Sequence, residues 1–336
     1  MTCLSLVACG GGTDDAVAVA DTVAPSTTPE TESTESEPTD TSEPRTVADP
    51  PVGDPPVDDE PVDEIADAAM GMTVQRIVVS DQAILDAALA LDLPVIATPG
   101  YSDREAIPSY LADRAAGIEV LAERSEVNLE SLANIRPDLL LFSSKQVESS
   151  GAREQLAEIA ELAELDVSTA DPWRDVLRDV ASAAGVPERA EHTISIADAA
   201  LERARRAIGP EGLAREVSVV RCFGDSCRYL PGGTSFPGQV LDELGVARPQ
   251  IQASDPEGRA FVDVSPERVD LLDGDIIVVF GTDAVDSLEQ LRQNPLWSRL
   301  DAVQAGEVYD VDPAAWFTGN AIAVEVIIDD MVRILR

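Results

Sequence analysis

The sequence predicts an α/β fold with mainly parallel sheets, arranged as two similar lobes that one long helix joins. From residue 74 onward, short apolar runs alternate with segments of helical periodicity. The run 275–280 is apolar after its first residue, which is typical of a strand buried on both faces. A long helical pattern in the middle of this region and a motif that occurs twice indicate the division into lobes.

The apolar runs give eight candidate strands, and a helix is expected directly after the first. The first helix is predicted over 81–91, because Ile84, Leu85, Ala88 and Leu91 fall on one helical face. The candidate strands are 76–80, 94–98, 118–121, 138–142, 165–168, 217–221, 275–280 and 307–311.

The long helix is predicted to begin near Pro187 and to end at about Ile208. Gly209 and Pro210 follow, and glycine after the last turn with proline beyond it is a helix stop. We therefore assign residues 73–185 to an N-terminal lobe, 186–209 to the connecting helix and 210–336 to a C-terminal lobe.

A short motif occurs twice, at 128–141 and at 265–278. Both copies have a capping residue first, Glu third, aliphatic residues fifth and eighth, Asp eleventh, and three aliphatic residues after that. Each copy predicts a short capped helix that leads into a buried strand. Two similar lobes explain the repetition, and chance recurrence of a common helix–strand motif is the alternative.

The N-terminal region predicts a membrane anchor and a tether. Leu6, Val7, Ala8 and Cys9 read as a lipobox, so we expect residues 1–9 to be the remnant of a lipoprotein signal and Cys9 to carry lipid. Only eight residues precede Cys9, which indicates a misassigned start or a shortened sequence. Residues 10–72 are rich in Thr, Ser, Pro, Asp and Glu and predict a disordered acidic tether.

Charge and composition argue against several classes of function. The formal net charge is −39, and it is spread over the tether and the folded part, so nucleic-acid binding is not expected. His192 is the single histidine and lies inside the long helix, as surface or packing histidines do. No zinc-site spacing, nucleophile elbow or phosphate-binding loop is present. A hydrolase that uses two carboxylates stays possible, but no pair stands out.

Cys222 and Cys227 flank a short segment that contains the turn dipeptide Gly224-Asp225. In an oxidising compartment this spacing predicts a disulfide that closes a loop. Two free thiols are the alternative.

Several motifs together resemble the helical-backbone class of ABC-transporter binding proteins, whose members bind ferric siderophores, haem or cobalamin. The motifs are 128–141 in the first lobe and 264–269 in the second, followed by 294–303 and 306–309, in that order. The resemblance covers roughly 74–336. It implies two Rossmann-like lobes with a ligand cleft between them, and a monomeric, non-enzymatic protein held on the extracytoplasmic face of the cell membrane by its lipid anchor alone.

The resemblance also implies which residues contact the ligand, because the cleft of this class is lined by loops that follow the strands. Aromatic rings could stack on a ferric siderophore, and Arg221 or Lys145 could pair with its charge. No cofactor is expected, since iron would be held by the ligand. The candidates are Tyr101, Ser143, Ser144, Lys145, Arg221, Tyr229, Phe261 and Trp316.

In this class a glutamate on each lobe pairs with arginines of the ABC permease. Glu267 matches the second-lobe position, and Glu148 or Glu154 matches the first. Glu267 also has a structural explanation. It would lie in the first turn of a helix that starts at Ser265 and Pro266, where an acid interacts favourably with the helix dipole. A ferric siderophore is the expected ligand. The alternatives are haem or cobalamin on the same fold, an enzyme on the same scaffold, and a surface-interaction lipoprotein.

Overall fold

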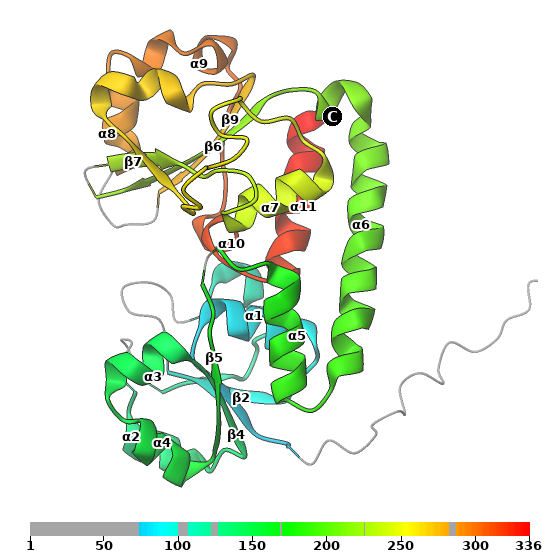
Figure 1. The fold of residues 1–336 in the computed structure, drawn as a ribbon, viewed down its shortest axis with the longest axis vertical. Coiled ribbons are helices and arrows are strands. Elements are labelled where there is room, and N and C mark those ends of the chain that lie inside the picture. The colour runs from blue at the N-terminus through cyan, green and yellow to red at the C-terminus, as the bar shows by residue number, and fades with distance from the viewer. Residues whose placement is uncertain (1–73, 100–106, 122–126, 169, 225, 282–286) are drawn as a thin grey trace, which may run out of the picture. The chain divides into compact units, whose positions relative to one another are not determined.

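The computed structural model describes residues 74–99, 107–121, 127–168, 170–224, 226–281 and 287–336. They form two five-stranded sheets with helices packed against them, which confirms the predicted α/β fold (Figure 1). Cys9, the tether 10–72 and Tyr101 lie outside the described residues. No helix in the described ranges combines the length and apolarity needed to cross a membrane.

The elements follow one another in the alternating order that the sequence predicts. The strands are β1 (Ile77–Val79), β2 (Val95–Thr98), β3 (Glu119–Val120), β4 (Leu139–Ser143), β5 (Glu161–Leu165), β6 (Val217–Phe223), β7 (Ser226–Tyr229), β8 (Val262–Val264), β9 (Ile276–Gly281) and β10 (Val308–Asp310). The α-helices are α1 (Gln82–Ala90), α2 (Leu129–Ile135), α3 (Ser144–Ser150), α4 (Arg153–Ile159), α5 (Trp173–Ala183), α6 (Pro187–Leu213), α7 (Phe236–Leu244), α8 (Ser287–Gln293), α9 (Asp301–Ala305), α10 (Pro313–Phe317) and α11 (Ala321–Leu335). Three 3-10 helices are η2 (Ser109–Leu111), η3 (Pro266–Leu272) and η4 (Trp297–Arg299).

The first sheet has the order β3-β2-β1-β4-β5, and all its pairings are parallel. Its central strands β1 and β4 are fully buried, as their apolar runs predict. The predicted strand at 165–168 is wrong, because β5 occupies 161–165. Glu161 and Glu164 interrupt β5, and a half-exposed edge strand of this kind does not give the continuous apolar run of a buried one.

The second sheet has the order β10-β9-β6-β7-β8. Strands β10, β9 and β6 are parallel, whereas β7 and β8 are antiparallel to their neighbours. Neither β7 nor β8 was predicted, since both are short and polar at alternate positions. The predicted disulfide between Cys222 and Cys227 is confirmed, and it joins residues directly opposite each other on β6 and β7.

Helix α6 connects the two sheets along the chain and packs on α11 and α5 (Figure 1). Its buried residues recur every three or four positions and form one apolar stripe. They include Ala190, Ile194, Ala197, Leu201, Ala204 and Ile208. Gly209 breaks the helix with φ 77° and ψ 170°, which confirms the predicted stop after Ile208, and one further turn follows from Pro210.

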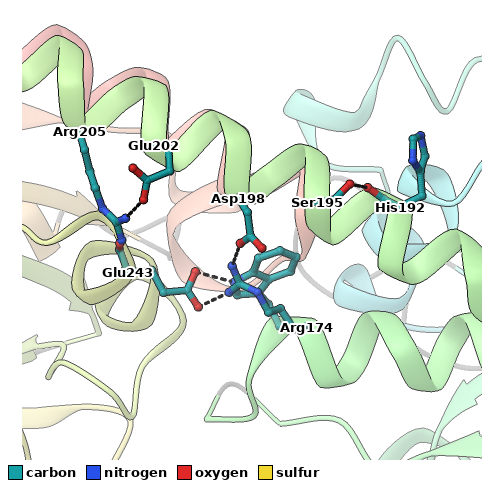
Figure 2. A network of polar contacts seen from close by, with 8 residues as sticks. Arg174, His192, Ser195, Asp198, Glu202, Arg205 and Glu243 are labelled. Carbon is teal, nitrogen blue, oxygen red and sulfur yellow. Dashed lines mark hydrogen bonds and ion pairs between the residues drawn. The ribbon is translucent and has the colours of Figure 1, made fainter.

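A polar network joins α6 to its neighbours (Figure 2). The guanidinium group of Arg174 on α5 forms ion pairs with Glu243 on α7 and with Asp198 on α6. The indole N–H of Trp173 donates to Glu243 at 3.3 Å. His192 is exposed on α6, in agreement with its interpretation as a surface residue, and only its backbone carbonyl joins the drawn contacts, accepting from the Ser195 hydroxyl.

The two copies of the repeated motif differ in their helices. In the first copy, Asn128 caps α2 by accepting a hydrogen bond from the Ser131 N–H at 3.0 Å. In the second copy the segment is the 3-10 helix η3, it is interrupted at Arg268, and Ser265 makes no side-chain cap. The expected capping role of Ser265 is therefore wrong, although each helix still leads into a buried strand.

The buried carboxylate of Asp86 joins α1, which follows the first strand, to α11 at the end of the chain. Its oxygens accept hydrogen bonds from the backbone N–H groups of Asn320, Ile322 and Ala323 at 2.8, 2.9 and 3.0 Å. The Tyr110 hydroxyl donates a fourth bond at 3.0 Å. Complete burial raises the pKa of Asp86 to about 6, although these four bonds act in the opposite direction.

The raised pKa of Asp86 predicts an unusual dependence of stability on pH. Since the folded-state pKa lies above the unfolded one, this carboxyl contributes stability that is full below pH 4 and is lost as pH rises through 6. Relative to Asp86→Asn, the wild-type free energy of unfolding should gain roughly 2 kcal/mol between pH 7 and pH 4. Urea unfolding of both proteins across this range measures the difference, and a difference that stays constant with pH contradicts the assignment.

Candidate functional site

The first-lobe candidates lie at the carboxyl end of β4. Ser143 is buried, and its hydroxyl accepts from the Gln146 N–H at 3.3 Å, so it caps α3. Its own N–H donates to the Ser80 hydroxyl at the end of β1, at 2.8 Å. Ser144 is half-buried and Lys145 is exposed, both in the first turn of α3. Lys145 is therefore the side chain of this group best placed to reach a ligand.

The second-lobe candidates are organised by the hairpin of β6 and β7. Arg221 and Arg228 are direct cross-strand partners, as are Cys222 and Cys227. Because side chains alternate between faces along a strand, Arg221, Phe223 and Arg228 lie on one face and the two cysteines on the other. Two arginines thus stand side by side on the same face at the carboxyl end of β6.

Aromatic rings cover both guanidinium groups. The Arg221 Cζ lies 3.9 Å from the ring centroid of Phe317 and 5.2 Å from that of Phe223. The Arg228 Cζ lies 4.4 Å from the ring centroid of Phe261. These distances are within the range of cation–π attraction.

Arg228 has an ion-pair partner on the neighbouring strand. Asp263, the cross-strand partner of Arg228 on β8, accepts from its Nη2 at 2.7 Å. The Nε of Arg228 is buried and has no hydrogen-bond partner among the described residues. Arg221 is only 6 % exposed, while the rings of Phe223 and Phe261 are 45 % and 39 % exposed. We call Arg221, Arg228, Phe223, Phe261 and Phe317 the arginine–phenylalanine cluster.

The cluster borders a small hollow and lies beside the contacts that join the two halves of the fold. The hollow, about 10 Å³, is lined by Arg221, Leu230, Ser235, Phe236, Ala260, Phe261 and Phe317. The Gln82 amide, in the first turn of α1, donates to the carbonyls of Ala314 and Thr318, both at 2.7 Å. Phe317 precedes Thr318 directly, so the first lobe reaches within one residue of the cluster.

Trp316 and Tyr229 are both buried in this structure. Trp316 is fully buried, and its indole N–H donates to Asp330 at 2.8 Å. Tyr229 is 5 % exposed and lies on the core face of β7, the face opposite Arg228. The expected stacking of these two rings stays a prediction, and their packing leaves little ring surface for a ligand in this structure.

Phe261 is exposed in this cluster and stays a predicted ligand contact, whereas sequence reasoning missed three members of the cluster. Arg228, Phe223 and Phe317 were not among the candidates. A signal for Arg228 was present, because Arg221 and Cys222 mirror Cys227 and Arg228 about the turn at Gly224. A hairpin closed by a disulfide at this turn places the two arginines opposite each other.

The three candidate docking glutamates are exposed. Glu148 lies in α3, Glu154 in the first turn of α4 and Glu267 in η3. Among the described residues, no group of three or more His, Cys, Asp or Glu side chains is arranged to hold a metal ion.

Comparisons with known proteins agree with this architecture. The chain is 28 % identical over 269 residues to the probable siderophore-binding lipoprotein YfiY of Bacillus subtilis, covering 76 % of this chain and 81 % of the relative. It is 27 % identical over 251 residues to the Fe(3+)-citrate-binding protein YfmC of the same organism, covering 73 % and 75 %. The solved structure of Staphylococcus aureus SirA with staphyloferrin B has a TM-score of 0.67 at 22 % identity, covering 79 % and 94 %.

The sequence profile of the periplasmic binding protein family matches residues 77–315, which include both sheets and α6. The described helices and strands over this range have the order expected for two α/β lobes. The chain belongs to the periplasmic binding protein family.

Proposed function

We propose that this protein captures an anionic ferric siderophore outside the cytoplasm and delivers it to an ABC importer. The observation that carries the proposal is the cross-strand pair of Arg221 and Arg228, with phenylalanine rings over both guanidinium groups. The names of several relatives also support the proposal, because they include siderophore-binding and Fe(3+)-citrate-binding proteins.

The arginine pair places two like charges side by side. Like charges directly opposite each other on neighbouring strands are destabilising, and the buried Nε of Arg228, which has no hydrogen-bond partner among the described residues, adds to the cost. Carboxylate or other anionic oxygens of a bound complex would offset both the repulsion between the guanidinium groups and the missing hydrogen bond, since guanidinium groups bind such oxygens through paired hydrogen bonds.

The exposed rings suit the organic part of such a ligand. Phe223 and Phe261 present apolar surface beside the charges, which matches a chelate that surrounds its metal with a carbon framework. Iron would be held by the chelator, so the protein needs no metal ligands of its own. Lys145 at the carboxyl end of β4 is the proposed contact from the first lobe.

Ligand titration of the full chain tests this function. With intrinsic tryptophan fluorescence as the readout, we expect saturable quenching by ferric citrate or another anionic ferric complex. Arg221→Gln and Arg228→Gln should each weaken binding roughly tenfold or more, because each removes charge-assisted hydrogen bonds. Raising the salt from about 0.05 M to about 0.5 M should also weaken binding.

Arg268→Gln is the matched control, because Arg268 is an exposed arginine of the same lobe that pairs with Asp270. A neutral ferric trihydroxamate, haem and cobalamin complete the panel. Tight binding of one of these, unaffected by the arginine substitutions, would exclude the anionic ligand while keeping a transport role. No binding of any complex would count against siderophore capture itself.

We also propose that lipid on Cys9 anchors the protein to the extracytoplasmic face of the cell membrane. The lipobox-like residues 6–9 support this, and relatives carry the word lipoprotein in their names. Cys9→Ser should move the protein from the membrane fraction to the soluble fraction of cells that express it. Retention of the variant in the membrane fraction would show that another segment provides the attachment.

Delivery to the permease is proposed to use Glu267 on the second lobe and Glu148 or Glu154 on the first. All three side chains are exposed, and none forms an ion pair with a described residue. Glu267→Arg should lower iron uptake several-fold in cells with the matching importer, because it replaces attraction to permease arginines by repulsion. Its ligand affinity should match the wild type, and Glu289→Arg on α8 is the control. Normal uptake by Glu267→Arg would remove this residue from the docking surface.

A further inference from the structure

We propose that the Cys222–Cys227 disulfide is a positioning element of the ligand site, which holds Phe223 against Arg221. This inference rests on the proposed function, because it concerns the same arginine–phenylalanine cluster. It assigns to the bond a role in affinity in addition to its role in the stability of the fold.

The disulfide lies where the sheet ends. On one side of the hairpin, β6 pairs with β9 as far as Cys222, which is opposite Gly281. On the other side, β7 pairs with β8 as far as Cys227, which is opposite Val264. Among the described residues, the Cys222–Cys227 pair is thus the last one with a neighbouring strand on both sides.

One further pair, Phe223 with Ser226, follows the last strand pairings of the described residues. The side-chain contacts resolved there are weak, since the Ser226 hydroxyl is 3.4 Å from the Phe223 carbonyl and from the Arg228 Nη2. A pair of strands gains little stability from its own cross-strand contacts in water. The covalent bond at the preceding pair therefore restricts where Phe223 lies.

The position of Phe223 matters because its ring is one of two that flank Arg221. Phe317 covers the Arg221 guanidinium from α10, and Phe223 approaches it from the hairpin. With 45 % of its surface exposed, Phe223 offers its ring to solvent and to a ligand. A ring that is already fixed loses less conformational freedom on binding, so preorganisation by the disulfide should raise affinity about threefold to tenfold.

A reporter at position 223 tests the positioning without any ligand. The three native tryptophans, Trp173, Trp297 and Trp316, are all buried, so Phe223→Trp adds the one indole at an exposed site. We expect its fluorescence anisotropy to fall, and its quenching by acrylamide to rise, when Cys222→Ala and Cys227→Ala are introduced together. Reduction of the unsubstituted disulfide by a dithiol, followed by alkylation, should have the same effect on the indole. This treatment replaces the double substitution if the cysteine variant folds poorly. Unchanged motion of the indole after loss of the bond overturns the inference.

A double-mutant cycle then tests the effect on affinity, with ferric citrate as the probe. Loss of the disulfide should weaken binding about threefold to tenfold in the wild-type background and less than twofold in Phe223→Ala. Phe261→Ala is the matched control, because this exposed ring belongs to the cluster but lies outside the hairpin, and the full weakening should persist there.

An equal loss of affinity in the wild-type and Phe223→Ala backgrounds would show that the bond acts only through overall stability, and the inference would be wrong. If ferric citrate does not bind the wild type, the proposed function loses its support, while the indole reporter still decides whether the disulfide positions residue 223.

Discussion

The Asp86 carboxylate is the contact on which the position of the segment between β10 and α11 depends. It accepts the backbone N–H groups at the start of α11, which would otherwise be buried without partners. The same α1 helix carries Gln82, which binds the carbonyls on either side of Phe317. The segment between β10 and α11 is therefore fixed by side chains from the first lobe, and this segment places the Phe317 ring over Arg221.

The charge of the whole chain and the charge of the site have opposite signs. A net charge of −39 repels anions at long range, yet electrolyte screens such repulsion beyond about 8 Å at physiological ionic strength. Attraction to the proposed anionic ligand must then come from groups in contact with it. Arg221 and Arg228 meet this requirement because both are largely withdrawn from solvent, where screening is weaker and hydrogen bonds to charge are stronger.

The sequence predicts best those structural features that depend on the residues of a single segment. Buried parallel strands such as β4 and β9 are continuous apolar runs, and Gly209 with Pro210 marks the end of the long helix regardless of its surroundings. Strands whose burial comes from their neighbours, such as β5, β7 and β8, carry no equivalent signal. Trp316 lies in α10, just after β10, and Tyr229 is the last residue of β7, so each lies near the end of a strand. The face on which each ring lies, however, is decided by tertiary packing.

The edge strands of both sheets carry exposed acidic residues. The outermost strands are β3 and β5 in the first sheet and β8 and β10 in the second. In the described chain each of them carries an exposed acid, namely Glu119, Glu161, Asp263 and Asp310. Three of the four strands are no longer than three residues. Short edge strands with charged side chains disfavour pairing with a strand of another molecule, so copies of the protein can be concentrated without joining their sheets.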